Sequence, residues 1–153
     1  ALSLKNLRLD VNFKYSLGND IYNYQRALLE SGSRFMNQTT ALNRRWMTEG
    51  QVTDIPKVVY GDPMGNSRFS DRWIEDGSYL KLKTVTLGYN VPIQNEYIQG
   101  ISVWVAANNL YTFTKYLGND PEITAGNSVL VQGIDAGYLN AGRSFTLGVK
   151  INL

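Results

Sequence analysis

The chain has 153 residues, of which 43% are hydrophobic and 12% aromatic, and its formal net charge is +2. It contains no Cys and no His, which excludes disulfides, thiolate metal sites and the Ser-His and Cys-His pairs of many hydrolases. Its 15 Lys and Arg residues are dispersed. We therefore expect no metal, no cofactor and no nucleic-acid partner.

A strand is predicted at about residues 4–17, because apolar and polar residues alternate there. Its length suits a tilted membrane strand, which needs about 9–11 residues, although a half-buried strand of a soluble sheet shows the same alternation. No apolar run approaches the ~20 residues of a membrane helix, so any membrane crossing would be made by strands. Because the sequence opens within a strand pattern, we expect it to be a piece of a longer protein.

Residues 18–72 are predicted to form a long folded loop, since connectors beyond about 12–15 residues usually have structure or function of their own. Asp20 could cap a short helix at its start. Trp46 and Trp73 could stack on a sugar ring, but packing within the loop is the simpler role for each.

The next strand is predicted at about residues 73–90, and its alternation changes phase midway. Leu80 and Leu82 occupy even positions, whereas the apolar residues after them occupy odd positions. A bulge could cause the change. We prefer a single register, with Lys81 and Lys83 pointing outward above a membrane and the two leucines packed inside.

A short turn at about residues 91–100 leads to a strand at about 101–114. Tyr111, Phe113 and Tyr116 cluster at and just beyond its far end. Such a cluster suits an interfacial girdle, although packing in a core would also explain it. A second polar loop, residues 115–142, precedes a final strand at about 143–153. The apolar positions of that strand are Phe145, Leu147, Val149, Ile151 and Leu153.

The order of long loop, short turn and long loop is the asymmetry of outer-membrane barrels. It predicts extracellular loops at 18–72 and 115–142 and a periplasmic turn at 91–100. Four strands cannot close a barrel, because the smallest have eight. Other residues must supply the rest of the wall.

Several stretches resemble the SusC/RagA family, the SusC-type TonB-dependent transporters of the Bacteroidetes. The stretches are residues 72–92 (RWIEDGSYLKLKTVTLGYNVP), 109–122 (NLYTFTKYLGNDPE), 133–137 (GIDAG) and 143–153 (RSFTLGVKINL), with 43–46 (NRRW) and 53–56 (TDIP) fitting the earlier loop. They follow the family's order over nearly the whole chain.

The resemblance implies an all-β fold, with this chain forming the C-terminal strands of a 22-stranded transmembrane barrel. It implies import of glycan or peptide fragments across the outer membrane, with a SusD-type surface lipoprotein, the TonB complex, and lipid and lipopolysaccharide as partners. The plug domain would lie outside this chain. Candidate ligand or lid contacts are Trp46, Arg72, Trp73, Asp120 and Glu122.

The resemblance also implies that the final strand acts as the signal for barrel assembly. The family usually ends on Phe, and this chain ends on Leu153. Two alternatives remain open at this point. One is a soluble carbohydrate-binding β-sandwich. The other, which we do not expect, is an outer-membrane enzyme with acid and base drawn from Glu75, Asp76, Asp120 and Glu122.

Overall fold

The computed structural model describes residues 1–93, 97–122, 125–126 and 128–152, and the chain divides into two compact units. The first, here called the sheet unit, comprises Ala1–Gly18, Ser78–Lys115 and Asn140–Leu153. The second, the loop unit, comprises Asn19–Gly77 and Tyr116–Leu139.

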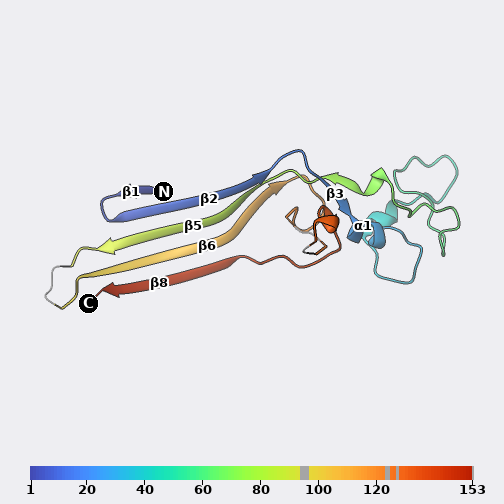
Figure 1. Ribbon diagram of the computed structural model, residues 1–153. Coiled ribbons are helices and arrows are strands. Elements are labelled where there is room, and N and C mark those ends of the chain that lie inside the picture. Colours follow the sequence, from blue (N-terminus) through green and yellow to red (C-terminus); the bar gives the residue numbers. More distant parts are fainter. Residues whose placement is uncertain (94–96, 123–124, 127, 153) are drawn as a thin grey trace. The chain divides into compact units, whose positions relative to one another are not determined.

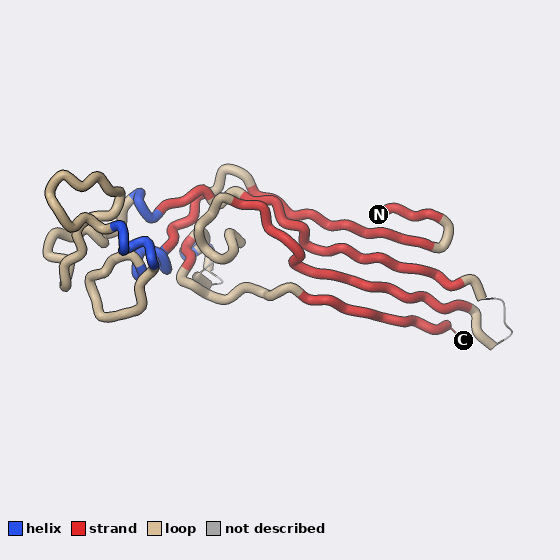
Figure 2. The backbone as a smooth tube through the Cα atoms, turned by 180° about the vertical axis from the view of Figure 1, so that it is seen from behind, coloured by secondary structure: helices blue, strands red, loops and turns tan. Residues whose placement is uncertain are grey.

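Antiparallel strands in the order β1-β2-β5-β6-β8 form the sheet unit (Figure 1). Figure 2 shows the long strands side by side from behind. Their bounds are β1 (Leu2–Leu4), β2 (Leu7–Ser16), β5 (Tyr79–Val91), β6 (Gly100–Thr114) and β8 (Ser144–Asn152).

A tight turn divides the strand that was expected at residues 4–17. Leu4 pairs with Leu7, and Lys5 between them has a φ of 51°. The described sheet therefore has five strands where the sequence predicted four. The expected strand at 73–90 is also divided, because its first residues form β4 (Ile74–Asp76) in the loop unit.

The bulge that the sequence analysis considered is present in β5. Asn12 pairs with Thr84 but Phe13 pairs with Leu82, so Lys83 is an extra residue opposite β2. An extra residue in one strand shifts its alternation by one position.

The preferred single register was therefore wrong. Leu80 and Leu82 lie on the same face of the sheet as Val85. Their partners on β2 are Tyr15, Phe13 and Val11, which alternate along that strand and therefore share a face. Leu80 is 42% exposed, whereas Lys81 is only 5% exposed. The expected placement, with Lys81 outward and the leucines inside, is reversed.

A second irregularity lies on β6 at the same level. Leu82 pairs with Tyr111 and Thr84 pairs with Asn108, so the single residue Lys83 of β5 lies opposite two residues of β6, Asn109 and Leu110. Asn109 has a φ of 53°, and its side-chain amide donates to the carbonyl oxygens of Ala141 and Gly142 at 3.3 and 3.4 Å. This contact ties the irregular part of β6 to the chain just before β8.

The loop unit has its own sheet, in the order β4-β3-β7, where β3 is Asp20–Asn23 and β7 is Ile134–Asp135. Helix α1 (Tyr24–Leu29) follows β3 and is capped by Asn23, not by Asp20 as predicted. The remaining elements are the 3-10 helices η1 (Thr40–Arg44), η2 (Asp71–Trp73) and η3 (Val129–Val131). Among the described residues, no helix is long and apolar enough to cross a membrane.

Candidate functional site

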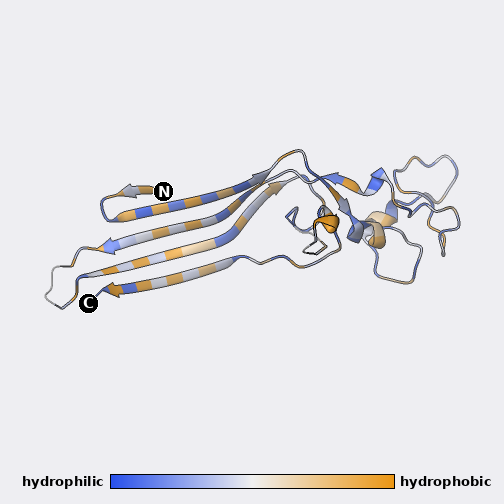
Figure 3. Cartoon of the chain, in the orientation of Figure 1, coloured by the Kyte–Doolittle hydropathy of each residue, from blue (hydrophilic) through white to orange (hydrophobic). Residues whose placement is uncertain are grey.

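One face of the sheet unit is apolar along every long strand. Because paired residues of antiparallel strands share a face, Leu9, Leu87, Val105 and Leu147 form one continuous row. Figure 3 shows the alternation as orange and blue bands along the strands. The other members of this apolar face are Leu7, Val11, Phe13, Tyr15, Leu80, Leu82, Val85, Tyr89, Ile101, Val103, Ala107, Tyr111, Phe113, Phe145, Val149 and Ile151.

The apolar face is open rather than covered by a second sheet. On β8, the exposed fractions are 72% for Phe145, 71% for Leu147, 57% for Val149 and 56% for Ile151. The fifth residue of the proposed assembly signal, Leu153, lies outside the described residues. Soluble monomers seldom expose an apolar patch of this extent, and a β-sandwich would bury this face against another sheet. The sandwich alternative is therefore not favoured.

The opposite face of the sheet is polar. Thr84 donates to Asn108 Oδ1 at 3.1 Å, and Asn108 Nδ2 donates to Ser144 Oγ at 3.1 Å, so one row of side chains links β5, β6 and β8. Trp104 lies on this face against Gly148, where any Cβ would collide with its indole ring. A polar inner wall and an apolar outer wall are the two surfaces that a membrane barrel requires.

Trp73, which the sequence analysis named as a possible ligand contact, is fully buried in the loop unit, with 0% exposure. The guanidinium carbon of Arg72 lies 4.5 Å from its ring centroid, and that of Arg26 lies 5.6 Å away. Trp73 therefore packs the loop unit through cation–π contacts and offers no surface to a ligand.

A charge network surrounds this tryptophan. Arg26 donates to Glu75 Oε1 at 2.8 Å and to Glu30 Oε1 at 3.1 Å. Glu75 also accepts from the Asn23 side chain at 3.2 Å and from the backbone N–H of Leu117 at 2.9 Å. Glu75 therefore joins the two chain segments of the loop unit, which is a structural role and not that of a free catalytic acid.

Arg72 completes the network. Its Nη2 lies 3.9 Å from Glu30 Oε2, beyond hydrogen-bond distance, and neither atom makes a hydrogen bond to the described residues. Burial lowers the pKa of Arg72, because desolvation outweighs the attraction of Glu30. Only 22% of the Arg72 side chain is exposed, so most of its surface contacts the loop unit and little is left for a ligand or partner.

Trp46 keeps part of its surface accessible. Its backbone N–H donates to the carbonyl oxygen of Ile55 at 2.9 Å, and Lys57 Nζ lies 5.8 Å from its ring. Of the two tryptophans named from the sequence, Trp46 is the one that could still touch a ligand or partner.

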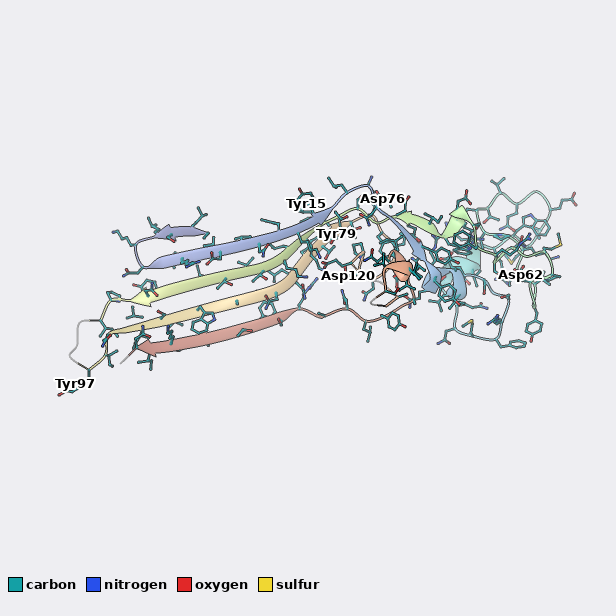
Figure 4. The ribbon with its side chains drawn as sticks, in the orientation of Figure 1. Tyr15, Asp62, Asp76, Tyr79, Tyr97 and Asp120 are labelled. Atoms are coloured by element: carbon teal, nitrogen blue, oxygen red, sulfur yellow. The ribbon has the colours of Figure 1, made fainter. Side chains whose placement is uncertain are left out.

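Asp120, labelled in Figure 4, is 3% exposed, and its Oδ1 accepts from the backbone N–H of Glu122 at 2.9 Å. This contact is a local turn of the kind that Asp commonly forms. Glu122 is half-buried. Asp120 thus forms a local turn, and its role and that of Glu122 as ligand or lid contacts stay predictions.

Tyr116 does not join the aromatic cluster expected on the sheet. Tyr111 and Phe113 do lie together there, with ring centroids 4.6 Å apart. Tyr116 is buried in the loop unit, and its hydroxyl donates to Asp135 Oδ2 at 2.6 Å. Burial and this hydrogen bond raise the pKa of Tyr116. Gly137 N–H donates to the second oxygen of Asp135 at 2.8 Å.

The loop unit also contains a cleft of about 230 Å³, which sequence reasoning did not predict. Its lining comes from two segments far apart in the chain, so no local pattern could mark it. The lining residues are Asn23, Gln25, Arg26, Leu29, Glu30, Thr39, Leu117, Gly118 and Asn119.

No family model matches the chain. TonB-dependent receptor P3 of Formosa agariphila is 34% identical over 158 residues, which cover 98% of this chain and 15% of the receptor. TonB-dependent receptor P26 of the same organism is 29% identical, covering 99% of this chain and 16% of the receptor. The chain thus spans about one sixth of the length of the curated relatives it matches.

Solved structures give the same result. A chain of the RagAB peptide transporter matches with a TM-score of 0.80 and 30% identity, over 97% of this chain and 16% of that one. The 'open-open' state of the RagAB peptide importer matches with a TM-score of 0.81 and 29% identity, over 99% of this chain. In sequence and in fold, then, this chain corresponds to a β-barrel segment of the SusC-type TonB-dependent receptors, as its resemblance to that family indicated.

Proposed function

We propose that the complete receptor imports nutrient oligomers, glycan or peptide fragments, across the outer membrane with energy from the TonB complex. The observation that carries this proposal is the match of nearly the whole chain to TonB-dependent receptors and to a peptide importer. This chain would supply wall and outer loops as the last strands of the barrel. The plug domain and the segment that contacts TonB would belong to the rest of the receptor. No catalytic step is part of the proposal.

The apolar face of the sheet unit would contact membrane lipid, and lipopolysaccharide at its outer edge. β6 has 15 residues, which at about 3.4 Å per residue and a tilt of about 40° rise about 39 Å through the membrane. The apolar band of a barrel is about 25 Å tall. The remaining length leaves room at the outer edge for Tyr111 and Phe113 to act as part of an aromatic girdle. The protein would then be an integral outer-membrane protein.

In this topology the loop unit lies outside the cell and the turn at residues 91–100 lies in the periplasm. The support is the difference in length between the two kinds of connection. Residues 94–96 of the turn lie outside the described residues.

The loop unit would also contact a SusD-type surface lipoprotein that acts as a lid. Phe35 and Tyr60 stack with centroids 4.9 Å apart, yet they are 94% and 69% exposed. Phe69 packs on Tyr22 at 4.8 Å and remains 72% exposed. Exposed aromatic pairs of this kind are typical of protein interfaces. Trp46 remains a candidate contact.

Uptake by whole cells tests the proposal. Cells that carry the complete receptor should accumulate a fluorescent peptide or oligosaccharide pool, and deleting either the receptor or TonB should abolish that uptake. A strain with the receptor but without the lid lipoprotein serves as the control for partner dependence. Uptake that continues without TonB would refute the proposal.

A further inference from the structure

The cleft of the loop unit lies at the seam between its two chain segments. Gln25, Leu29 and Thr39 line it from the first segment, and Leu117 and Asn119 line it from the second. At about 230 Å³ it is far larger than the ~30 Å³ share of one water molecule, but smaller than the ~300–1,000 Å³ pockets that enclose whole small ligands. A cleft of this size suits a short stretch of a longer ligand.

Both walls of the cleft are held in place. The backbone N–H of Leu117 is bonded to Glu75, and the backbone N–H of Tyr22 donates to the carbonyl oxygen of Gly133 at 2.7 Å. The parallel pairing of β3 with β7 adds a second link between the segments. The cleft is therefore preformed, which reduces the entropic cost of binding.

The chemistry of the lining is polar but uncharged overall. Gln25 and Asn119 are exposed amides, one on each segment. Thr39 Oγ1 makes no hydrogen bond to the described residues. Two cations and two carboxylates balance one another at the cleft. Arg26, which also lines it, pairs with Glu30 and Glu75, and Arg72 Nη2 lies 3.9 Å from Glu30 Oε2. Among the described residues of the cleft, a charged ligand would therefore find no unmatched opposite charge.

An extended polypeptide backbone fits this lining. Side-chain amides donate and accept hydrogen bonds as peptide groups do, and Leu29 with Leu117, which is 71% exposed, offers an apolar contact for one side chain. None of the described residues that line the cleft is aromatic, so a sugar ring would find no flat apolar surface among them on which to stack.

We propose that this cleft is a cargo subsite for a short, uncharged stretch of extended peptide. The inference rests on the proposed import function and selects peptide from its two cargo classes.

The test uses the complete receptor with its lid lipoprotein, purified in detergent. The probe is an acetylated and amidated hexapeptide of Ala, Ser and Leu, with a neutral glucose hexasaccharide as the comparison ligand. The variants Gln25→Leu and Asn119→Leu should each raise the Kd for the peptide about 3- to 10-fold, the loss expected for one or two hydrogen bonds. Asn43→Leu changes an exposed amide of the loop unit that does not line the cleft, and it should change the Kd less than about twofold.

Several results would overturn the inference. The first is that the wild-type receptor does not bind the hexapeptide. The second is that it binds the hexasaccharide tightly and that the same variants weaken this binding. The third is that the variants leave the Kd for the peptide unchanged. A photo-crosslinker at position 119 that attaches to the receptor's own loops in peptide-free protein would show that the cleft is already filled. In each case TonB-dependent uptake by cells can still be measured, so the cleft can fail while the import function stands.

Discussion

Reversing the polarity of the apolar face should prevent the receptor from folding in a membrane. Leu147 is the best position, because it is 71% exposed and belongs to the central row formed with Leu9, Leu87 and Val105. An Arg at the bilayer midplane of a barrel's lipid face costs about 2–4 kcal/mol. At 1.36 kcal/mol per tenfold, Leu147→Arg should lower the folding equilibrium constant by about 30- to 1,000-fold.

Thr146→Arg is the matched control. Thr146 neighbours Leu147 on the same strand but points to the polar face, where it pairs with Ala106. An Arg there can stay hydrated in the barrel interior, so the expected cost is well below 1 kcal/mol.

The assay is urea-dependent folding of the complete receptor into lipid vesicles, followed by the heat-modifiable shift of the folded barrel on gels. The expected order of stability is wild type, then Thr146→Arg, then Leu147→Arg far below. Equal losses in the two variants would refute the assigned faces, and with them the lipid contact of the sheet.

Three further predictions concern other parts of the chain. In intact cells a membrane-impermeant thiol label should react with the variant Val52→Cys but not with Tyr97→Cys, because Val52 is 99% exposed in the loop unit and Tyr97 belongs to the proposed periplasmic turn. The opposite pattern would mean that the topology is inverted. Removing residues 151–153 should abolish outer-membrane assembly, measured as the amount of folded barrel in outer-membrane fractions. Leu153→Phe should be tolerated, and Leu153→Asp should reduce that amount. Wild-type levels of the truncated protein would show that β8 is not an assembly signal. Because the folded state raises the pKa of Tyr116 above its ordinary value of 10.0, the stability it adds is complete below about pH 10 and falls as the pH rises further. Limited proteolysis of the loop unit should therefore accelerate from pH 9 to 11 in wild type more than in Tyr116→Phe, and equal acceleration would count against the Tyr116–Asp135 hydrogen bond as the cause.

The long strands could be predicted from the sequence because a period of two is visible over ten or more residues. The turn at Lys5 could also have been found, since the leucines change from even positions, 2 and 4, to odd positions, 7 and 9. The bulge at Lys83 was harder, because Lys81 and Lys83 both fit a polar position and only the pairing with β2 shows which residue is extra.

The loop unit was the least predictable part. Its cohesion depends on contacts between distant segments, such as Tyr22 with Ile134, which leave no local pattern. Trp73 could not be distinguished from a ligand platform, because a buried and an exposed tryptophan look alike in sequence. The match to a known family indicated the barrel, but it did not show that two loops fold together.

The loop unit is built from two chain segments, Asn19–Gly77 and Tyr116–Leu139, so it cannot complete its fold until both have been made. Its strands β3 and β7 are joined in parallel although they lie more than a hundred residues apart, with β5 and β6 between them. Such distant pairing is slow to form. In the proposed topology it cannot begin until both chain segments of the loop unit have reached the outer side of the membrane. In that topology the two segments would cross before their joint fold is complete and would fold last. Burial of Trp73 would then report that the neighbouring hairpin has been inserted, and a stalled barrel would be recognisable to surface proteases by its unfolded loops.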